Sequence, residues 1–286
     1  MNNSRRRTAR HRAVATRAIL GIAASGALVL TAAPASAAPA TTPVPGGAVC
    51  DPKAEACLAV VVNSGNFDNN GFTLPMKDGD MIIAGTLPEQ GDIIPRDDGH
   101  NGVYGRPMTV PGGVLGFDLP LNNLFGLAGV TSEVQAVSVP HFNTDNITDF
   151  DMSLPVRLKI NNTFLGDNCY IGSPETPVVF NLKPANTPAD PPGSTIGAPY
   201  PEGTVSMTNV KNEATGFALP GATGCGPFGA LNPIVNWRAK VPNSTGTSLN
   251  TVSTGYLFPA AAGGTDPLTG AGTGGSSGSS GGSSGS

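Results

Sequence analysis

The stretch "MSLPVRLKIN", Met152–Asn161, decides the fold class of this chain of 286 residues. Its apolar side chains alternate strictly with polar ones, which is the period of a strand with one buried and one wet face. Pro155 has no backbone N–H to donate to a neighbouring strand, so we expect the stretch at a sheet edge or beside a bulge. The sequence therefore predicts an amphipathic β-strand here.

A second stretch, "VNWRAKV" at 235–241, shows the same alternation. It predicts another strand, with Val235, Trp237, Ala239 and Val241 buried and with Arg238 and Lys240 in water. Because Trp237 is the only tryptophan of the chain, we expect it to lie in a hydrophobic core.

Further strand candidates are short runs separated by turn-forming segments such as "DNNG", "KDGD" and "PADPPGST". The chain has 39 glycines and 27 prolines, which disfavour helix interiors, so we expect no helix longer than three turns. These features predict an all-β, antiparallel β-sandwich or barrel-like domain over residues 49–262, with a possible subdivision near 140–150. The candidate runs are 57–63, 81–87, 114–120, 130–139, 177–182, 204–210 and 251–258.

The two ends of the chain have different compositions from the middle. Six arginines precede the apolar run "AILGIAASGALVLTAA" and the small-residue site "ASA" at 35–37, which is the pattern of a signal peptide over residues 1–37. The run is shorter than the ~20 residues that cross a bilayer, so we expect no transmembrane segment after cleavage. Residues 38–48 are expected to be a spacer, and the Gly/Ser-rich residues 263–286 a disordered tail.

These ends predict a secreted protein, extracellular or loosely associated with the cell wall. Both the general secretory and the twin-arginine routes are compatible with the sequence. Residues 1–37 hold six of the sixteen basic residues and none of the twenty acidic ones, so the remainder carries 10 against 20 and a net charge near −10. Such a charge disfavours nucleic acid as a partner.

Four cysteines remain in an exported chain, and an even number in an oxidising compartment indicates disulfides. Three pairings are possible in principle. Cys50 and Cys57 lie in one short segment, whereas Cys169 and Cys225 lie in two glycine-rich turns, so one local and one long-range bridge is the economical solution. The long-range bridge would contribute on the order of 3 to 4 kcal/mol by the chain-entropy model. A catalytic Cys169 would in addition require a histidine base.

Signals for metal binding and catalysis are weak. Only His100 and His141 follow residue 37, without zinc-binding spacing, and no cofactor is indicated. The acidic turns with Asp97 and Asp98, and with Asp145, Asp149 and Asp151, could hold calcium, although solvated turns are the commoner interpretation.

No catalytic residue is assigned from the sequence. The three GxSxG matches lie in the Gly/Ser tail, without the strand and helix of a nucleophile elbow. A carboxylate pair such as Glu133 and Asp151 would serve glycoside hydrolysis only within about 5 to 9.5 Å of each other.

The segment "LPVRLKINNTFLGDNCYIGSPETPVVFNL" and the later "PGATGCGPFGALNPIVNWRAKVPNSTGTSLNTVSTGYL" carry a family resemblance. Through the "LGDNCYIGS" and "GCG" turns, roughly residues 151–258 resemble an uncharacterised family of secreted actinobacterial proteins. The resemblance implies export, a Cys169–Cys225 bridge and a shared β architecture, and it transfers no catalytic residue.

The sequence favours an exported, non-catalytic protein of the cell envelope or medium with a structural, binding or assembly role. Its partner would be an envelope component, a protein or a small apolar ligand. The alternative is a secreted hydrolase of ester or glycoside bonds, whose serine or carboxylate pair only folding would assemble. One deep cleft with His141 or His100 against a serine or an acid would favour that alternative.

Overall fold

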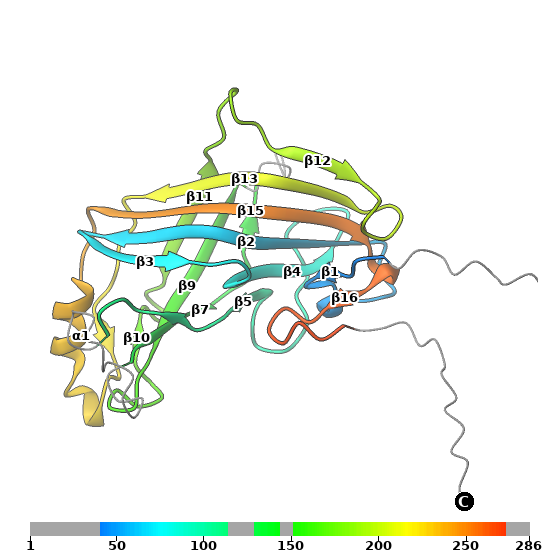
Figure 1. Ribbon diagram of the computed structural model, residues 1–286. Helices are drawn as coiled ribbons and strands as arrows, with labels where there is room; N and C mark the ends of the chain where they lie inside the picture. The colour runs from blue at the N-terminus through cyan, green and yellow to red at the C-terminus, as the bar shows by residue number, and fades with distance from the viewer. Residues whose placement is uncertain (1–40, 114–128, 144–150, 273–286) are drawn as a thin grey trace, which may run out of the picture. The chain divides into compact units, whose positions relative to one another are not determined.

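The computed structural model describes residues 41–113, 129–143 and 151–272. The described chain is mostly β, with one short α-helix and a few 3-10 turns (Figure 1). Its elements are β1 (Val44–Pro45), η1 (Gly47–Val49), β2 (Ala56–Asn69), β3 (Phe72–Met76), β4 (Met81–Leu87), β5 (Val103–Gly105), β6 (Met108–Thr109), β7 (Thr131–Ala136), β8 (His141–Phe142), β9 (Met152–Asn161), β10 (Tyr170–Ile171), β11 (Val178–Pro184), β12 (Gly193–Ile196), β13 (Val205–Thr215), β14 (Ala222–Thr223), η4 (Pro227–Gly229), α1 (Asn232–Ala239), β15 (Thr247–Pro259), η5 (Ala260–Ala262) and β16 (Gly264–Thr265).

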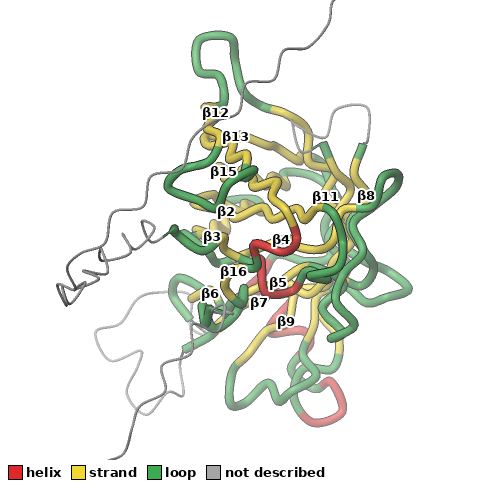
Figure 2. The backbone as a smooth tube through the Cα atoms, turned by 90° about the vertical axis from the view of Figure 1, so that its right-hand side faces the viewer, coloured by secondary structure: helices red, strands yellow, loops and turns green. Residues whose placement is uncertain are grey.

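All described strands except β1 and β16 belong to two antiparallel layers. In the first layer the order is β12, β13, β15, β2, β4 and β5. Strand β3 forms a hairpin with β2 and pairs with its second half. In the second layer β9 is central, between β10 and β11 on one side and β7 and β8 on the other. The long strands β13, β15 and β2 run side by side in Figure 1, β9 crosses them steeply, and Figure 2 shows the layers from the end opposite α1. The predicted all-β, antiparallel class is thus confirmed.

Strand β11 connects the two layers. Its first part, Val178–Leu182, pairs with β9, whereas Lys183 and Pro184 pair with β13. Strands on both sides of residues 140–150 pair with β9, so the described residues before and after that point share one sheet.

The main core lies between the layers and includes the apolar face of β9. Alternate residues of β9 are buried from Met152 to Ile160, and the residues between them are half-exposed, as the alternation predicts. Strand β2 contributes Leu58, Val60 and Val62 to this core.

A second, smaller core covers the other face of β2. It receives Cys57, Ala59 and Val61, the residues that alternate with those of the main core. The apolar run that begins β2 is therefore buried on both faces, which explains why it does not alternate with polar residues. Tyr104 and Phe258 from neighbouring strands complete this core.

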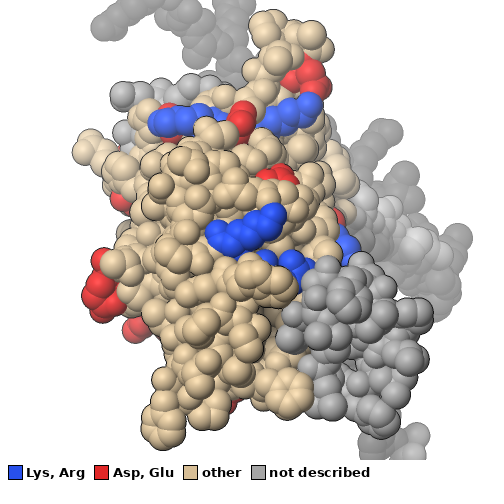
Figure 3. Space-filling model, turned by 90° about the vertical axis from the view of Figure 1, so that its left-hand side faces the viewer, with Lys and Arg blue, Asp and Glu red and all other residues tan. Residues whose placement is uncertain are grey.

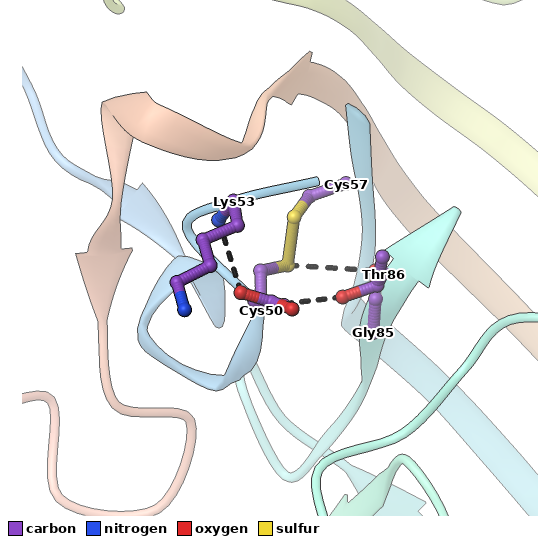
Figure 4. The surroundings of a disulfide bond; sticks show 6 residues. Cys50, Lys53, Cys57, Gly85 and Thr86 are labelled. Carbon is purple, nitrogen blue, oxygen red and sulfur yellow. Dashed lines mark hydrogen bonds between the residues drawn. A yellow bond between two sulfur atoms is a disulfide. The ribbon is translucent and has the colours of Figure 1, made fainter. Parts of the chain in front are cut away.

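Two disulfides join the described segments. Cys50 pairs with Cys57 and Cys169 with Cys225, so no described cysteine is a free thiol. Figure 4 shows that the first bridge holds the turn before β2 against β4, where Cys50 Sγ lies 3.4 Å from Gly85 O. In the same turn Asp51 N donates to Thr86 Oγ1 at 3.0 Å.

The expectation of an edge position for Pro155 is wrong, because β9 is flanked on both sides. The regular pairing of β9 with β7 and β8 is nevertheless interrupted at Pro155. Val137 N donates to Pro155 O at 3.0 Å, and in an antiparallel ladder the N and the O of one residue face the same neighbour. The missing donor of Pro155 therefore faces the gap between the end of β7 and the start of β8.

The predicted strand at 235–241 is also wrong, because Asn232–Ala239 forms α1. Pro233 lies in the first helical turn, where its fixed φ and missing N–H are tolerated. Lys240 ends the helix in a left-handed conformation with φ 56°, and Val241 N donates to Asn236 O at 3.0 Å. Val235 and Val241 are buried as expected, but Trp237 is 74% exposed.

Structure extends past the expected domain boundaries at both ends. Val44 and Pro45 of the expected spacer form β1, which pairs in parallel with β16, Gly264–Thr265, of the expected tail. Val44 is fully buried in the second core. The strand candidate at 114–120 lies outside the described residues; each of the other candidate runs overlaps a strand.

Candidate ligand-binding cavity

An apolar cavity of about 240 Å³ lies at the end of the sandwich where α1 packs. Its walls come from the β2–β3 hairpin, from β9 and from α1. Most of the lining is aliphatic or aromatic, and the polar exceptions are Ser132, Asn162 and Arg238. Apolar lining residues include Phe67, Phe72, Leu74, Val130, Leu158, Ile160, Leu165, Ile171, Leu219, Leu231, Ile234, Val235, Ala239 and Val241.

The start of α1 is tied to the turns that carry the long-range disulfide. Leu231 N donates to Cys225 O at 2.9 Å, and Cys225 N donates to Asn232 Oδ1 at 2.9 Å. Cys169 then links this turn covalently to the start of β10, and Gly226 N donates to Leu165 O at 2.7 Å. The disulfide therefore holds two segments of the cavity wall together.

The end of α1 is held by the tip of the β2–β3 hairpin. Asn69 is fully buried, and its Nδ2 donates to Ala239 O at 2.8 Å and to Lys240 O at 3.1 Å. Asn243 Nδ2 donates in turn to Asn69 Oδ1 at 2.6 Å. Both ends of α1 are thus fixed, with its Val235 side at the cavity and its Trp237 side exposed.

The cavity opens at a rim of exposed apolar side chains. Phe164 and Ile234 line the cavity and are also 57% and 50% exposed. Trp237 follows Ile234 by one helical turn and is exposed as well. Figure 3 views the molecule from the α1 side, and the described residues in the lower part of this face include very few Lys, Arg, Asp or Glu.

Arg238 is the single charged residue among the described residues of the wall. Its Nη2 donates to Pro111 O at 2.6 Å and its Nε to Gly113 O at 3.3 Å. The guanidinium carbon lies 5.4 Å from the centre of the Phe72 ring. Within the described ranges no carboxylate lies within ion-pair distance of Arg238, and its bonds to Pro111 and Gly113 use two of its five N–H donors.

A smaller space of about 20 Å³ lies beyond the inner end of the cavity. Both spaces share Phe67, Leu74, Ser132 and Leu158 as walls. The ring of Phe67 packs against those of Phe180 and Phe217, with centroids 6.3 and 6.0 Å away. The other walls of the inner space include three methionines, Met76, Met81 and Met108.

The two histidines lie away from this cavity. His141 Nδ1 is 2.9 Å from Asp92 Oδ2, and the His141 side chain is 75% exposed. Ser153 lies opposite His141 in the β8–β9 register. The imidazole of His100 lies 5.0 Å from the Tyr104 ring. An acid and a serine thus do come near His141, but on an open surface.

The acidic turns make local contacts. Burial alone would raise the pKa of Asp98, but hydrogen bonds from His100 N, Tyr104 and Arg96 outweigh it, and the pKa is lowered. Asp151 forms an ion pair with Lys183 at 2.8 Å, and that hydrogen bond is the largest cause of its lowered pKa.

No group of three metal-ligating side chains is found in the described ranges; Asp145 and Asp149 lie outside them. Glu133 pairs with Lys159 near one end of β9, whereas Asp151 precedes the other end. About eight residues of strand, or ~26 Å, separate the two positions, which is too far for glycoside hydrolysis.

Sequence reasoning missed the wall residues, because they come from segments with no shared pattern. One signal was available: between Ala214 and Thr265 there is no Asp or Glu, and Arg238 and Lys240 are the only charged residues. Part of this stretch is the mostly buried strand β15, but its remaining residues include α1 and the cavity wall around it.

Comparison with protein-family models, with curated proteins and with solved structures finds no match to this chain. In the part of the chain that the structure describes, the single α-helix is far too short to cross a bilayer.

Proposed function

We propose that this protein is an exported, non-catalytic binding protein that holds a small apolar ligand in the cavity beneath α1. The observation that carries the proposal is a cavity of about 240 Å³ with an almost wholly apolar wall. An apolar cavity of about 150 Å³ stays dry and binds benzene. A larger one with an open rim is suited to a larger apolar molecule.

Export is part of the proposal. The arginine-rich start, the apolar run and the "ASA" site support it, as does the resemblance to secreted actinobacterial proteins. Two disulfides fit an extracellular or otherwise oxidising environment. The ligand would then be an apolar molecule of the envelope or the medium, where free apolar compounds need a carrier in water.

Binding of 1-octanol, a neutral single-chain probe, tests this function. We expect saturable heat in calorimetry and a rise in Tm, because a ligand that binds only the folded state stabilises it by RT ln(1 + [L]/Kd). Ala239→Phe places a ring in the cavity and should weaken octanol binding about tenfold or more. Ala261→Phe, the same substitution at an exposed position outside the wall, is the matched control and should bind as the parent does. Absence of saturable binding to the parent protein contradicts the proposal.

The secreted hydrolase is the second candidate, and the contact between His141 and Asp92 favours it. The exposed position of His141 and its absence from the cavity wall oppose it. We expect p-nitrophenyl octanoate to be hydrolysed at the same rate by the parent protein and by His141→Ala. A loss of hydrolysis of at least tenfold in His141→Ala would establish esterase chemistry at this surface.

A further inference from the structure

We propose that the ligand is an unbranched acyl chain with an anionic head group, and that Arg238 binds the head group while Phe67 limits the length of the chain. This inference rests on the proposed function and names the class of its ligand. It follows from the two ends of the cavity, which differ in chemistry.

At the outer end stands a cation without a carboxylate partner among the described residues. Arg238 bonds two backbone carbonyls, of Pro111 and Gly113, which fix its guanidinium at the wall while leaving other N–H groups to donate. Its planar donors suit a carboxylate or a phosphate. The acid-free stretch from Ala214 to Thr265 keeps competing carboxylates of the same segment away from this rim.

At the inner end the cavity and the inner space share four wall residues, Phe67, Leu74, Ser132 and Leu158. Phe67 is the only aromatic residue of the four, and it is buried. The three methionines beyond it have flexible, unbranched side chains that can rearrange around an entering group. A chain that fills the cavity from the rim therefore ends at these shared residues, and a side chain smaller than Phe67 would open the route to the inner space.

The volume sets the length of the chain. Since about 150 Å³ accommodates benzene, a cavity of about 240 Å³ accommodates on the order of ten non-hydrogen atoms. A medium-length chain, of about eight to ten carbons, is therefore the expected ligand. Each additional methylene that is buried should strengthen binding about fourfold until the chain reaches Phe67.

The head group is tested by comparing octanoate, octyl phosphate and 1-octanol in calorimetric titrations at pH 7. We expect the parent protein to bind at least one of the two anions about tenfold or more tightly than octanol. The affinity for octyl phosphate, compared with that for octanoate, distinguishes a phosphate head group from a carboxylate. Arg238→Gln should abolish the preference for the anion and leave octanol binding unchanged, whereas Lys240→Gln, at the neighbouring cation outside the wall, should preserve it.

The length limit is tested with a series of n-alkanoates from six to fourteen carbons. In the parent protein, affinity should rise with length and then stop rising. In Phe67→Leu, and more strongly in Phe67→Ala if it folds, the limit should move upward by two or more carbons. Phe217 packs against Phe67 but lines neither the cavity nor the inner space. Phe217→Leu should therefore show the same limit of chain length as the parent protein.

The outcomes separate this inference from the function on which it rests. Saturable binding of octanol with no preference for either anion, or an unchanged length limit in both Phe67 variants, overturns the inference and leaves the binding function in place. Absence of binding by every probe, octanol included, overturns both.

Discussion

The position of Trp237 on α1 decides how little this side chain contributes to the packed core. It lies on α1 one turn after Ile234 and is 74% exposed. Val235, two residues earlier, is buried and lines the cavity. The large aromatic side chain therefore contributes surface at the rim, while the small aliphatic one contributes to the packed wall.

We expect Trp237→Ala to change the free energy of unfolding by no more than about 0.5 kcal/mol, because an exposed side chain loses little transfer energy. Val235→Ala should cost about 2 kcal/mol, since two buried methyl groups are removed. Urea denaturation of both variants measures the difference. A second measurement is the fluorescence of the single tryptophan, which acrylamide should quench readily in the folded parent protein. A cost of 3 kcal/mol or more for Trp237→Ala would mean that Trp237 is packed in solution.

At the scale of elements, alternation of apolar and polar residues predicted a strand correctly only where it extended over many residues. The ten residues of β9 alternate over their full length, and the structure buries the expected face. The seven residues 235–241 alternate too, yet they form most of α1. In a helix, residues i and i+4 share a face and residue i+2 points away from it, so in α1 Val235 and Ala239 line the cavity while Trp237 is exposed. The helix-start signal was Pro233 after a glycine-rich turn, and it outweighs the alternation.

The position of β9 could not be deduced from its own sequence. Pro155 indicates that a backbone donor is missing, and an edge is the simplest place for it. In the structure β7 and β8 share one side of β9 and leave a gap at Pro155, which serves the same purpose inside a sheet. Only the pairing of distant segments reveals such a gap.

At the scale of the whole described domain, composition and spacing predicted the all-β class and a pattern of two disulfides. They did not predict the cavity, because its wall combines residues from the β2–β3 hairpin, β9 and α1. Each of these segments has ordinary core residues on its own. An internal cavity arises from imperfect packing between elements, and no periodicity within one element encodes it.

The two ends of the described domain meet beside the second core. Val44 is fully buried, and its strand β1 pairs with β16. A Cβ on Gly264 would lie 2.1 Å from Val44 O, so only glycine permits this close approach. Beyond β16, Arg106 Nη2 donates to Pro267 O at 2.8 Å, and Asp266 lies 3.8 Å from Arg96. Residues 263–272 therefore cover part of the domain, although sequence composition assigns them to the tail.

Truncation at two points tests this assignment. A chain ending at Ala262 loses β16 and uncovers Val44, so we expect its free energy of unfolding to fall by about 2 kcal/mol or more. A chain ending at Gly272 keeps β16 and loses only residues 273–286, whose Gly/Ser composition offers no apolar side chain to bury; its stability should match that of the full chain. Urea denaturation of the two truncated proteins and the full chain measures both effects. Equal stability of all three would show that β1 and β16 contribute nothing to the fold, whereas a loss on removal of 273–286 alone would place a stabilising contact in that segment.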